Sequence, residues 1–210
     1  MASTATPYGL KPVNELGGTP YAGATRSFLL NPDGSAATIY NGSPVYINSS
    51  GYLAVASATG ADATTNGFPT GSQNPQTGIV GVFVGCSYVN AQGQVIYAQY
   101  YPTGTTGVVN AYVVDDPGVV FQVQSAGSVT QAALGANTFF STGAVLTGST
   151  TTGNSTASVV AGSSAITTTA AFRIVGFVNM VGFSVVGDAY TDILVKINPG
   201  YHSYTNAVGL

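Results

Sequence analysis

Apolar and polar residues alternate along two short stretches of this chain. In residues 191–197 the apolar side chains at every second position share one face, and Asp192 and Lys196 lie on the other. Residues 117–124 follow the same period, with an apolar face made of Val119, Phe121 and Val123. A period of two predicts β-strands with one face on a core and the other in water.

Further short runs rich in β-branched and aromatic residues are separated by Gly, Asn and Pro. They are residues 37–40, 44–48, 52–56, 94–101, 108–114 and 171–178. This spacing predicts an all-β fold, either an antiparallel sandwich or a small barrel of short strands. Only Ser128–Gly135 favours a helix: Ser128 or Thr130 could cap a single turn that Gly135 ends. We therefore expect at most one or two short helical turns.

Two stretches, residues 78–85 and 172–183, are apolar at nearly every position. A strand of this kind is covered on both faces. We expect the cover to be a second sheet or a neighbouring subunit.

The pattern divides the chain into three parts. Residues 1–34 alternate Gly, Pro and aromatic residues without a regular period and predict an extended N-terminal arm. Residues 35–198 form the β domain, and residues 199–210 form an aromatic C-terminal tail. Within the domain, residues 141–170 are nearly all Ser, Thr, Gly and Ala, which is typical either of an exposed loop or of an edge hairpin around residues 152–155.

Charge is unusually scarce. Asp, Glu, Lys and Arg make up 5% of the 210 residues, against about 25% in an ordinary soluble domain. A surface with so few charges is poorly protected against association, so we expect the chain to work inside an assembly. The four basic residues are spread over the chain, which argues against nucleic-acid binding.

The first ten residues contain no basic or long apolar segment, and no apolar run approaches the length of about 20 residues that a membrane helix needs. We expect synthesis in the cytoplasm and no membrane partner. The single cysteine, Cys86, lies in an apolar run and is predicted to be buried.

Candidate catalytic groups are few. The one histidine, His202, lies in the C-terminal tail without a nucleophile motif nearby, so we expect a solvent or interface histidine rather than a catalytic one. One Cys and one His cannot supply a zinc site. We expect no enzyme activity and no cofactor. The thirteen tyrosines fit half-buried sheet positions and subunit contacts better than a sugar-binding groove.

Asp115 and Asp116 are adjacent acids between two strand-like runs, in a chain with seven acids in all. They precede Pro117 and Gly118, and this order predicts a type II turn in which the carboxylates bond nearby backbone amides. Because such a turn does not suit a tight hairpin, we expect a corner where the chain passes from one sheet to another. A calcium site at the two acids is the weaker alternative, since further oxygen ligands would have to come from other loops.

Several phrases taken together resemble a family of virion structural proteins of tailed bacteriophages, especially short-tailed and marine phages. They are YGLKPVNELGGTPYAG (8–23), VGVFVGCSY (80–88), QYYPTGT (99–105), AYVVDDPGVVFQVQ (111–124) and VGDAYTDILVKINPGYHSYTN (186–206). Residues 141–170 carry no part of the resemblance. Proteins of this family are described as capsid decoration or cement proteins.

The resemblance implies a β-rich module on the outer surface of the expanded phage head, where it would clamp subunits of the major capsid protein as a dimer or trimer. An arm and a tail would attach by burying apolar anchors in a partner. The residues expected at capsid or oligomer contacts are Tyr8, Leu10, Pro12, Tyr21, Tyr201, His202 and Tyr204. Deletion of residues 2–20 should then weaken attachment without unfolding the domain. The alternative is a tail- or fibre-associated module, or one that binds host glycans.

Overall fold

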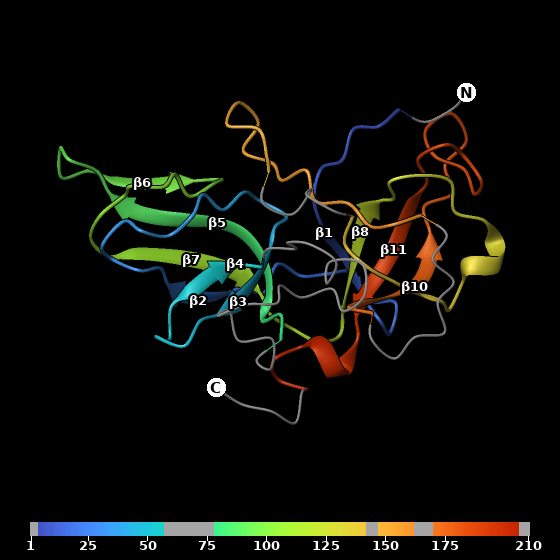
Figure 1. The fold of residues 1–210 in the computed structure, drawn as a ribbon, viewed down its shortest axis with the longest axis horizontal. Coiled ribbons are helices and arrows are strands. Elements are labelled where there is room, and N and C mark those ends of the chain that lie inside the picture. Colours follow the sequence, from blue (N-terminus) through green and yellow to red (C-terminus); the bar gives the residue numbers. More distant parts are fainter. Residues whose placement is uncertain (1–3, 57–77, 142–146, 162–169, 206–210) are drawn as a thin grey trace.

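The structure is a computed structural model that describes residues 4–56, 78–141, 147–161 and 170–205. The chain forms two antiparallel sheets, and the described strands close no barrel. The all-β prediction is confirmed. In Figure 1 the two sheets lie side by side along the longest axis of the molecule. None of the described helices is long and apolar enough to span a membrane.

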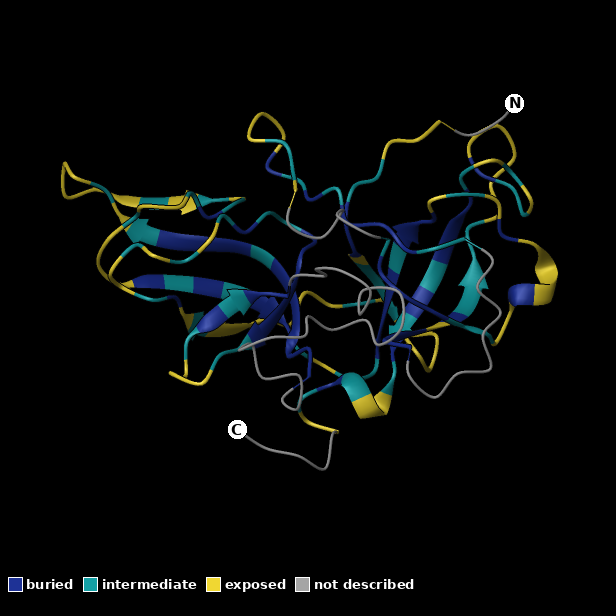
Figure 2. Ribbon diagram, viewed as in Figure 1, coloured by how far each residue is buried: buried dark blue, intermediate teal, exposed yellow. Residues whose placement is uncertain are grey.

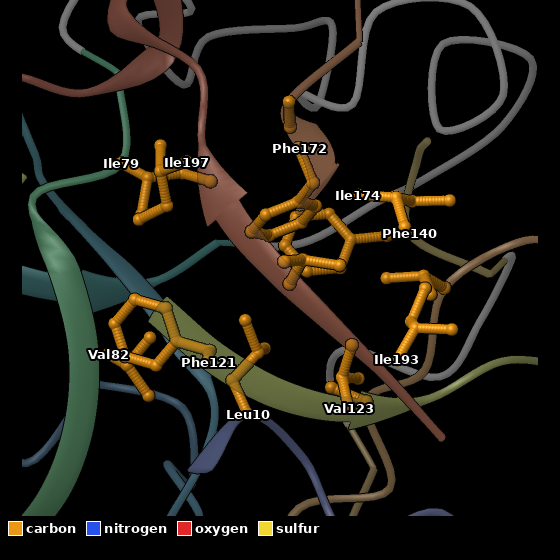
Figure 3. Packing of buried hydrophobic residues seen from close by; sticks show 14 of the residues in the cluster. Leu10, Ile79, Val82, Phe121, Val123, Phe140, Phe172, Ile174, Ile193 and Ile197 are labelled. Carbon is orange, nitrogen blue, oxygen red and sulfur yellow. The ribbon is translucent and has the colours of Figure 1, made fainter. Parts of the chain in front are cut away.

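Sheet A has five strands. In spatial order they are β1 (Lys11–Glu15), β8 (Val119–Gln124), β11 (Asp192–Ile197), β10 (Phe172–Phe177) and β9 (Asn137–Thr138). The alternation of β8 and β11 is confirmed, because their predicted apolar faces belong to one buried cluster. Figure 3 shows this cluster, in which Phe140 meets Phe172 edge to face with ring centroids 4.6 Å apart.

Sheet B has six strands. They are β2 (Arg26–Leu29), β7 (Val109–Val114), β5 (Gly81–Val89), β3 (Pro44–Ile47) and β4 (Leu53–Val55) in spatial order, with β6 (Val95–Ala98) also paired to β5. A second buried cluster fills its inner face. Cys86 belongs to that cluster as predicted, and burial raises the pKa of its thiol to about 11.

The described residues contain two helical elements, both single 3₁₀ turns: η1 (Gln131–Ala133) and η2 (Pro199–Tyr201). The turn expected within residues 128–135 is therefore confirmed, although the side chain of Thr130 at its start makes no capping hydrogen bond. The Ser128 hydroxyl instead donates to the Gly187 carbonyl.

The N-terminal segment differs from the expected arm, because it supplies an edge strand to each sheet. β1 pairs with β8 in sheet A, and β2 pairs with β7 in sheet B. Leu10 is fully buried in the core of sheet A. Gly and Pro break the strand period of this segment, so pairing with strands more than 80 residues away decides its structure.

The Ser/Thr-rich region contains a hairpin, one of the two alternatives that its sequence left open. The Thr156 amide donates to the Thr147 carbonyl, and the Ser149 amide donates to the Asn154 carbonyl. Gly148 faces the ring of Tyr40 so closely that a Cβ would lie 2.3 Å from it, which keeps the hairpin against the body of the protein. The rest of this region, residues 142–146 and 162–169, lies outside the described residues, as do residues 57–77.

The two continuous apolar runs have different outcomes. The first run is covered on both faces by the chain itself where it enters β5, since Phe83 belongs to the core of sheet B and Val82 to that of sheet A. The second run is buried only in part. After β10 the chain turns sharply, and Met180, Val181 and Phe183 are exposed at the tip. Here the apolar pattern predicted a buried strand and was wrong, because a turn at Gly182 with positive φ interrupts it.

Candidate functional site

The chain passes between the two sheets at Asp115–Gly118, between β7 and β8. The predicted corner is confirmed. The Asp116 carboxylate accepts the Gly118 amide at 2.7 Å, and the Val119 amide donates to the Asp116 carbonyl at 3.2 Å. The turn is not the predicted type II, because Gly118 lacks the positive φ which that type requires. Asp at the first position and Pro at the second favour a type I turn instead.

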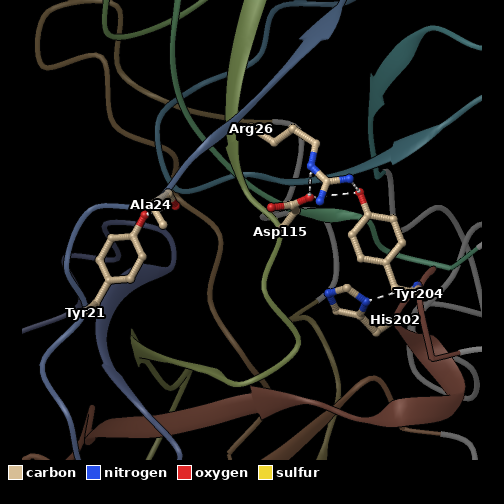
Figure 4. Close-up of polar contacts among 6 residues, drawn as sticks. All are labelled: Tyr21, Ala24, Arg26, Asp115, His202 and Tyr204. Carbon is tan, nitrogen blue, oxygen red and sulfur yellow. Dashed lines mark hydrogen bonds and ion pairs between the residues drawn. The ribbon is translucent and has the colours of Figure 1, made fainter.

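Asp115 joins the corner to two distant segments of the chain (Figure 4). Its carboxylate lies 2.9 Å from Nε of Arg26, the first residue of β2. It also accepts a 2.8 Å hydrogen bond from the Tyr204 hydroxyl. Arg26 in turn donates to the same hydroxyl at 3.2 Å, and its guanidinium lies over the Tyr204 ring. Burial and the Asp115 carboxylate raise the pKa of Tyr204 to about 12.

This arrangement accounts for both acids without a ligand. One carboxylate is engaged by Arg26 and Tyr204, and the other by a backbone amide. Among the described residues, no group of three or more His, Cys, Asp or Glu is placed to hold a metal ion. The geometry therefore favours the corner over the calcium site.

The C-terminal tail lies against its own chain. The Ile79 amide donates to the Tyr201 carbonyl, and the Ser203 amide donates to the Ile79 carbonyl. His202, between these two bonds, is 1% exposed, so the expected solvent or interface histidine is a buried one. Its Nδ1 accepts the Tyr204 amide at 3.2 Å. Within the described chain its Nε2 is buried without a hydrogen-bond partner.

The environment of His202 opposes its protonation. Burial lowers the pKa of the imidazole, while the nearby carboxylates of Asp115 and Asp116 act in the opposite direction. As a neutral imidazole that accepts a hydrogen bond from the Tyr204 amide, His202 has a structural role.

A second polar cluster holds the N-terminal residues on the outer face of sheet A. The Tyr8 hydroxyl donates to the Asp192 carboxylate at 3.0 Å and accepts from the Gln122 amide at 2.8 Å. The Gln124 side chain bonds the backbone of Thr6 and of Thr4. The sequence placed Asp192 on a wet face, and this was wrong because the chain's own N-terminus covers it. Burial raises the pKa of the Asp192 carboxyl.

Most residues expected at partner contacts are engaged within the chain. Leu10 and His202 are buried, and Tyr21 and Tyr201 pack partly against the core of sheet A. Pro12 lies in β1 and pairs with Phe121. The Tyr21 hydroxyl donates to the Ala24 carbonyl (Figure 4). Tyr204, 44% exposed, is the most accessible of this set, and partner contact through it stays a prediction.

The surface offers other apolar groups that the sequence analysis did not single out. The outer face of sheet B carries side chains from four neighbouring strands, and we call it the open face. Its members are Ser27, Leu29, Ser87, Val89, Val95, Tyr97, Asn110 and Tyr112. Leu29, Val89, Val95 and Tyr97 are exposed large hydrophobic residues, and Tyr97 is 78% exposed. Figure 2 shows the exposed positions of β6 in yellow.

Each sheet with its loops forms one lobe of the molecule. The lobe of sheet A carries a second exposed apolar group, which we call the apolar tip. It consists of Met180, Val181 and Phe183, of which Val181 is 93% exposed. The Phe183 amide donates to the Met180 carbonyl and closes the turn.

One clue to the open face was present in the sequence: residues 95–98 are all apolar, so a strand there must place apolar side chains on both faces.

No family model matches this chain, and neither the curated proteins nor the solved structures contain a match to it.

Proposed function

We propose that the chain is a structural virion protein of a tailed bacteriophage, a capsid decoration protein on the outer surface of the expanded head. In this role it stabilises contacts between subunits of the major capsid protein. It is made in the host cytoplasm, acts as a homo-oligomer, and works without catalysis, a cofactor, nucleic acid or a membrane. The sequence phrases that resemble this class of proteins are one support for the proposal.

The observation that carries the proposal is the pair of uncharged apolar surfaces on one protein body. The open face lies on sheet B and the apolar tip lies beyond β10 of sheet A. Exposed apolar groups of this kind mark binding surfaces, because a free protein gains nothing from keeping them in water. Two such surfaces on separate lobes suit a protein that bridges neighbours in a lattice.

The polar contacts around Asp115 at the corner support a bridging role, because they connect the two lobes. Arg26 in sheet B, Asp115 at the corner and Tyr204 in the tail form one hydrogen-bonded group. The two cores also share residues, since Val82 of β5 and Val114 of β7 belong to the cluster of sheet A. A connected body transmits force between its two binding surfaces better than two domains on a flexible linker.

The apolar tip supplies the experiment. Phe183→Ser should lower the affinity of the protein for expanded heads, measured by co-sedimentation of purified protein with heads of the phage that encodes it. Leu134→Ser is the matched control, because Leu134 is also an exposed apolar residue of the sheet A lobe but lies at the end of η1. Equal attachment of both variants would remove the tip from the contact.

If the wild-type protein does not bind heads at all, the proposal fails. The protein would then be assigned to the alternative, a tail- or fibre-associated or glycan-binding module. Sedimentation with isolated tails, and saturable binding of host glycans, would distinguish those two outcomes.

A further inference from the structure

The open face of sheet B is uncharged. Its eight members are apolar residues, tyrosines, serines and one asparagine. Their direction follows from strand alternation, because Phe28, Cys86, Ala98, Val109 and Ala111 turn toward the core of sheet B. A hydrogen bond between the Ser87 and Tyr112 hydroxyls, 2.9 Å long, joins two of its strands.

One row of side chains across this face is nearly palindromic. Strand register places Leu29 beside Asn110, Asn110 beside Ser87, and Ser87 beside Tyr97. The row therefore reads apolar, polar, polar, apolar from β2 to β6. The adjacent row pairs Val89 with Val95, and Val108, one residue before β7, is exposed at the same end of the sheet.

A palindromic row is what a two-fold contact between identical sheets requires. When the axis runs along the strands between β7 and β5, each residue meets the residue at the mirrored place in the row. Leu29 then meets Tyr97 of the second copy, and Asn110 meets Ser87 of the second copy. Apolar groups thus meet apolar groups. The Asn110 amide meets the polar pair formed by Ser87, which is 8% exposed, and the Tyr112 hydroxyl bonded to it.

The next row fits the same operation. Tyr112 on β7 is paired in register with Gly85 on β5. The two-fold operation therefore places the Tyr112 ring of one copy over Gly85 of the other, a residue without a side chain. The absence of charge removes the like-charge repulsion that a two-fold contact imposes on any charged group near its axis. Interface centres elsewhere are likewise depleted of charge and enriched in tyrosine.

We propose that the open face of sheet B is a homodimer interface in which two copies pack face to face about this two-fold axis. Facing sheets pack about 10 Å apart with their strands roughly aligned. The proposal gives the expected homo-oligomer a specific surface. It does not depend on the virion role, since dimerisation can be measured with the purified chain alone.

A cross-link between copies tests the geometry. β2 and β6 are separated by β7 and β5, so Leu29 and Tyr97 of one chain lie about 14 Å apart, too far for a disulfide within a chain. Leu29→Cys combined with Tyr97→Cys should give covalent dimers with a short thiol-reactive cross-linker, because facing backbones about 10 Å apart are too distant for a direct disulfide. Either single variant should give few, because each new thiol then faces an unchanged residue. Cys86 is buried and should not contribute.

A charge substitution tests the surface. Tyr97→Lys should weaken dimerisation at least about tenfold in analytical ultracentrifugation, because two unpaired ammonium groups would enter the contact. Val181→Lys adds the same charge at an exposed apolar position of the other lobe and should leave the dimer intact. Unchanged circular dichroism spectra would show that both variants fold.

Three results would overturn the proposal: a monomeric wild-type protein, a trimer, or equal loss of association in both lysine variants. If the protein is monomeric and Tyr97→Lys abolishes binding to heads, the open face is a capsid contact instead. A dimer that does not bind heads keeps this inference and refutes the decoration function, so the two failures are distinguishable.

Discussion

Gly81 lies directly against the backbone of Val114, where β5 passes the end of β7. A Cβ on Gly81 would lie 2.2 Å from the Val114 carbonyl oxygen and 2.9 Å from Cα of Asp115. Both neighbours are main-chain atoms and cannot move aside as a flexible side chain would. The close approach places β5 beside the corner, where the sheets meet.

Gly81→Ala should therefore destabilise the protein. We expect a cost of about 3 kcal/mol, at the upper end of the usual range for overpacking. In a chain of this size that lowers the melting temperature by roughly 6–12 °C. Gly17→Ala is the control, since a Cβ there meets nothing within 4 Å and no positive φ opposes it. Equal melting temperatures for the two variants would contradict the tight contact.

Asp115 should contribute to stability through its two partners and not through a metal ion. Asp115→Ala removes the Arg26 ion pair and the Tyr204 hydrogen bond, and should cost about 1–2 kcal/mol. A double-mutant cycle with Arg26→Ala should give a coupling below about 1 kcal/mol, because the Arg26 side chain is 61% exposed.

Calcium should leave the melting temperature of the wild-type protein unchanged. A rise on addition of calcium that Asp115→Ala abolishes would restore the ligand-site interpretation of the aspartate pair.

His202 should make the stability depend on pH. Its pKa in the folded protein is lowered by burial, so the unfolded chain takes up a proton first as the pH falls. The stability that depends on a neutral His202 is fully present above the pKa of histidine in the unfolded chain, about 6.5. It is lost progressively as the pH falls below that value. Denaturant titrations at pH 8, 7, 6 and 5 should show the decline.

His202→Asn should flatten that decline, whatever it does to the stability at pH 8. Asp192 acts with the opposite sign, because its raised pKa favours the folded protein as the pH falls toward the usual aspartate range. The difference between wild type and variant isolates the histidine. An identical pH profile for the two proteins would show that the tail and its buried imidazole are not linked to folding.

The N-terminal segment should be required for stability. Leu10→Ala removes a fully buried side chain from the core of sheet A and should cost about 2–5 kcal/mol (Figure 3). Leu16→Ala, in the same segment but at an exposed position, should change the free energy of unfolding by less than about 0.5 kcal/mol. For the same reason, deletion of residues 2–20 should unfold sheet A and not merely weaken attachment. A stable, cooperative fold after that deletion would instead support an N-terminal arm that is not part of the folded domain.

The sequence predicted those parts of the fold that depend on neighbouring residues, such as strand alternation and turns. The alternation of β8 fixes which of its side chains face the core, and the order Asp, Pro, Gly after β7 predicts a corner. The Thr and Val residues of the stretch 141–170 allowed a hairpin, which forms at residues 147–156, although its glycine content equally allowed an exposed loop. In each case the residues that carry the pattern also make the decisive contacts.

The parts that the sequence did not predict depend on partners far away in the chain. Asp192 looks like a solvent-facing residue until Tyr8 covers it from 184 positions away. His202 looks like a tail residue until Ile79 pairs with its neighbours Tyr201 and Ser203. The open face was overlooked because exposure is a property of the assembled sheet and has no period of its own. Its exposed members look like ordinary strand residues in the sequence.

We infer that this protein binds the outside of the phage head at defined lattice positions. The most direct measurement is a co-sedimentation titration with empty expanded heads, taken to saturation and counted as copies bound per capsid subunit. We predict saturation at a fixed ratio that matches the symmetry of the lattice. Absence of binding, or binding that rises without a plateau, would contradict the claim.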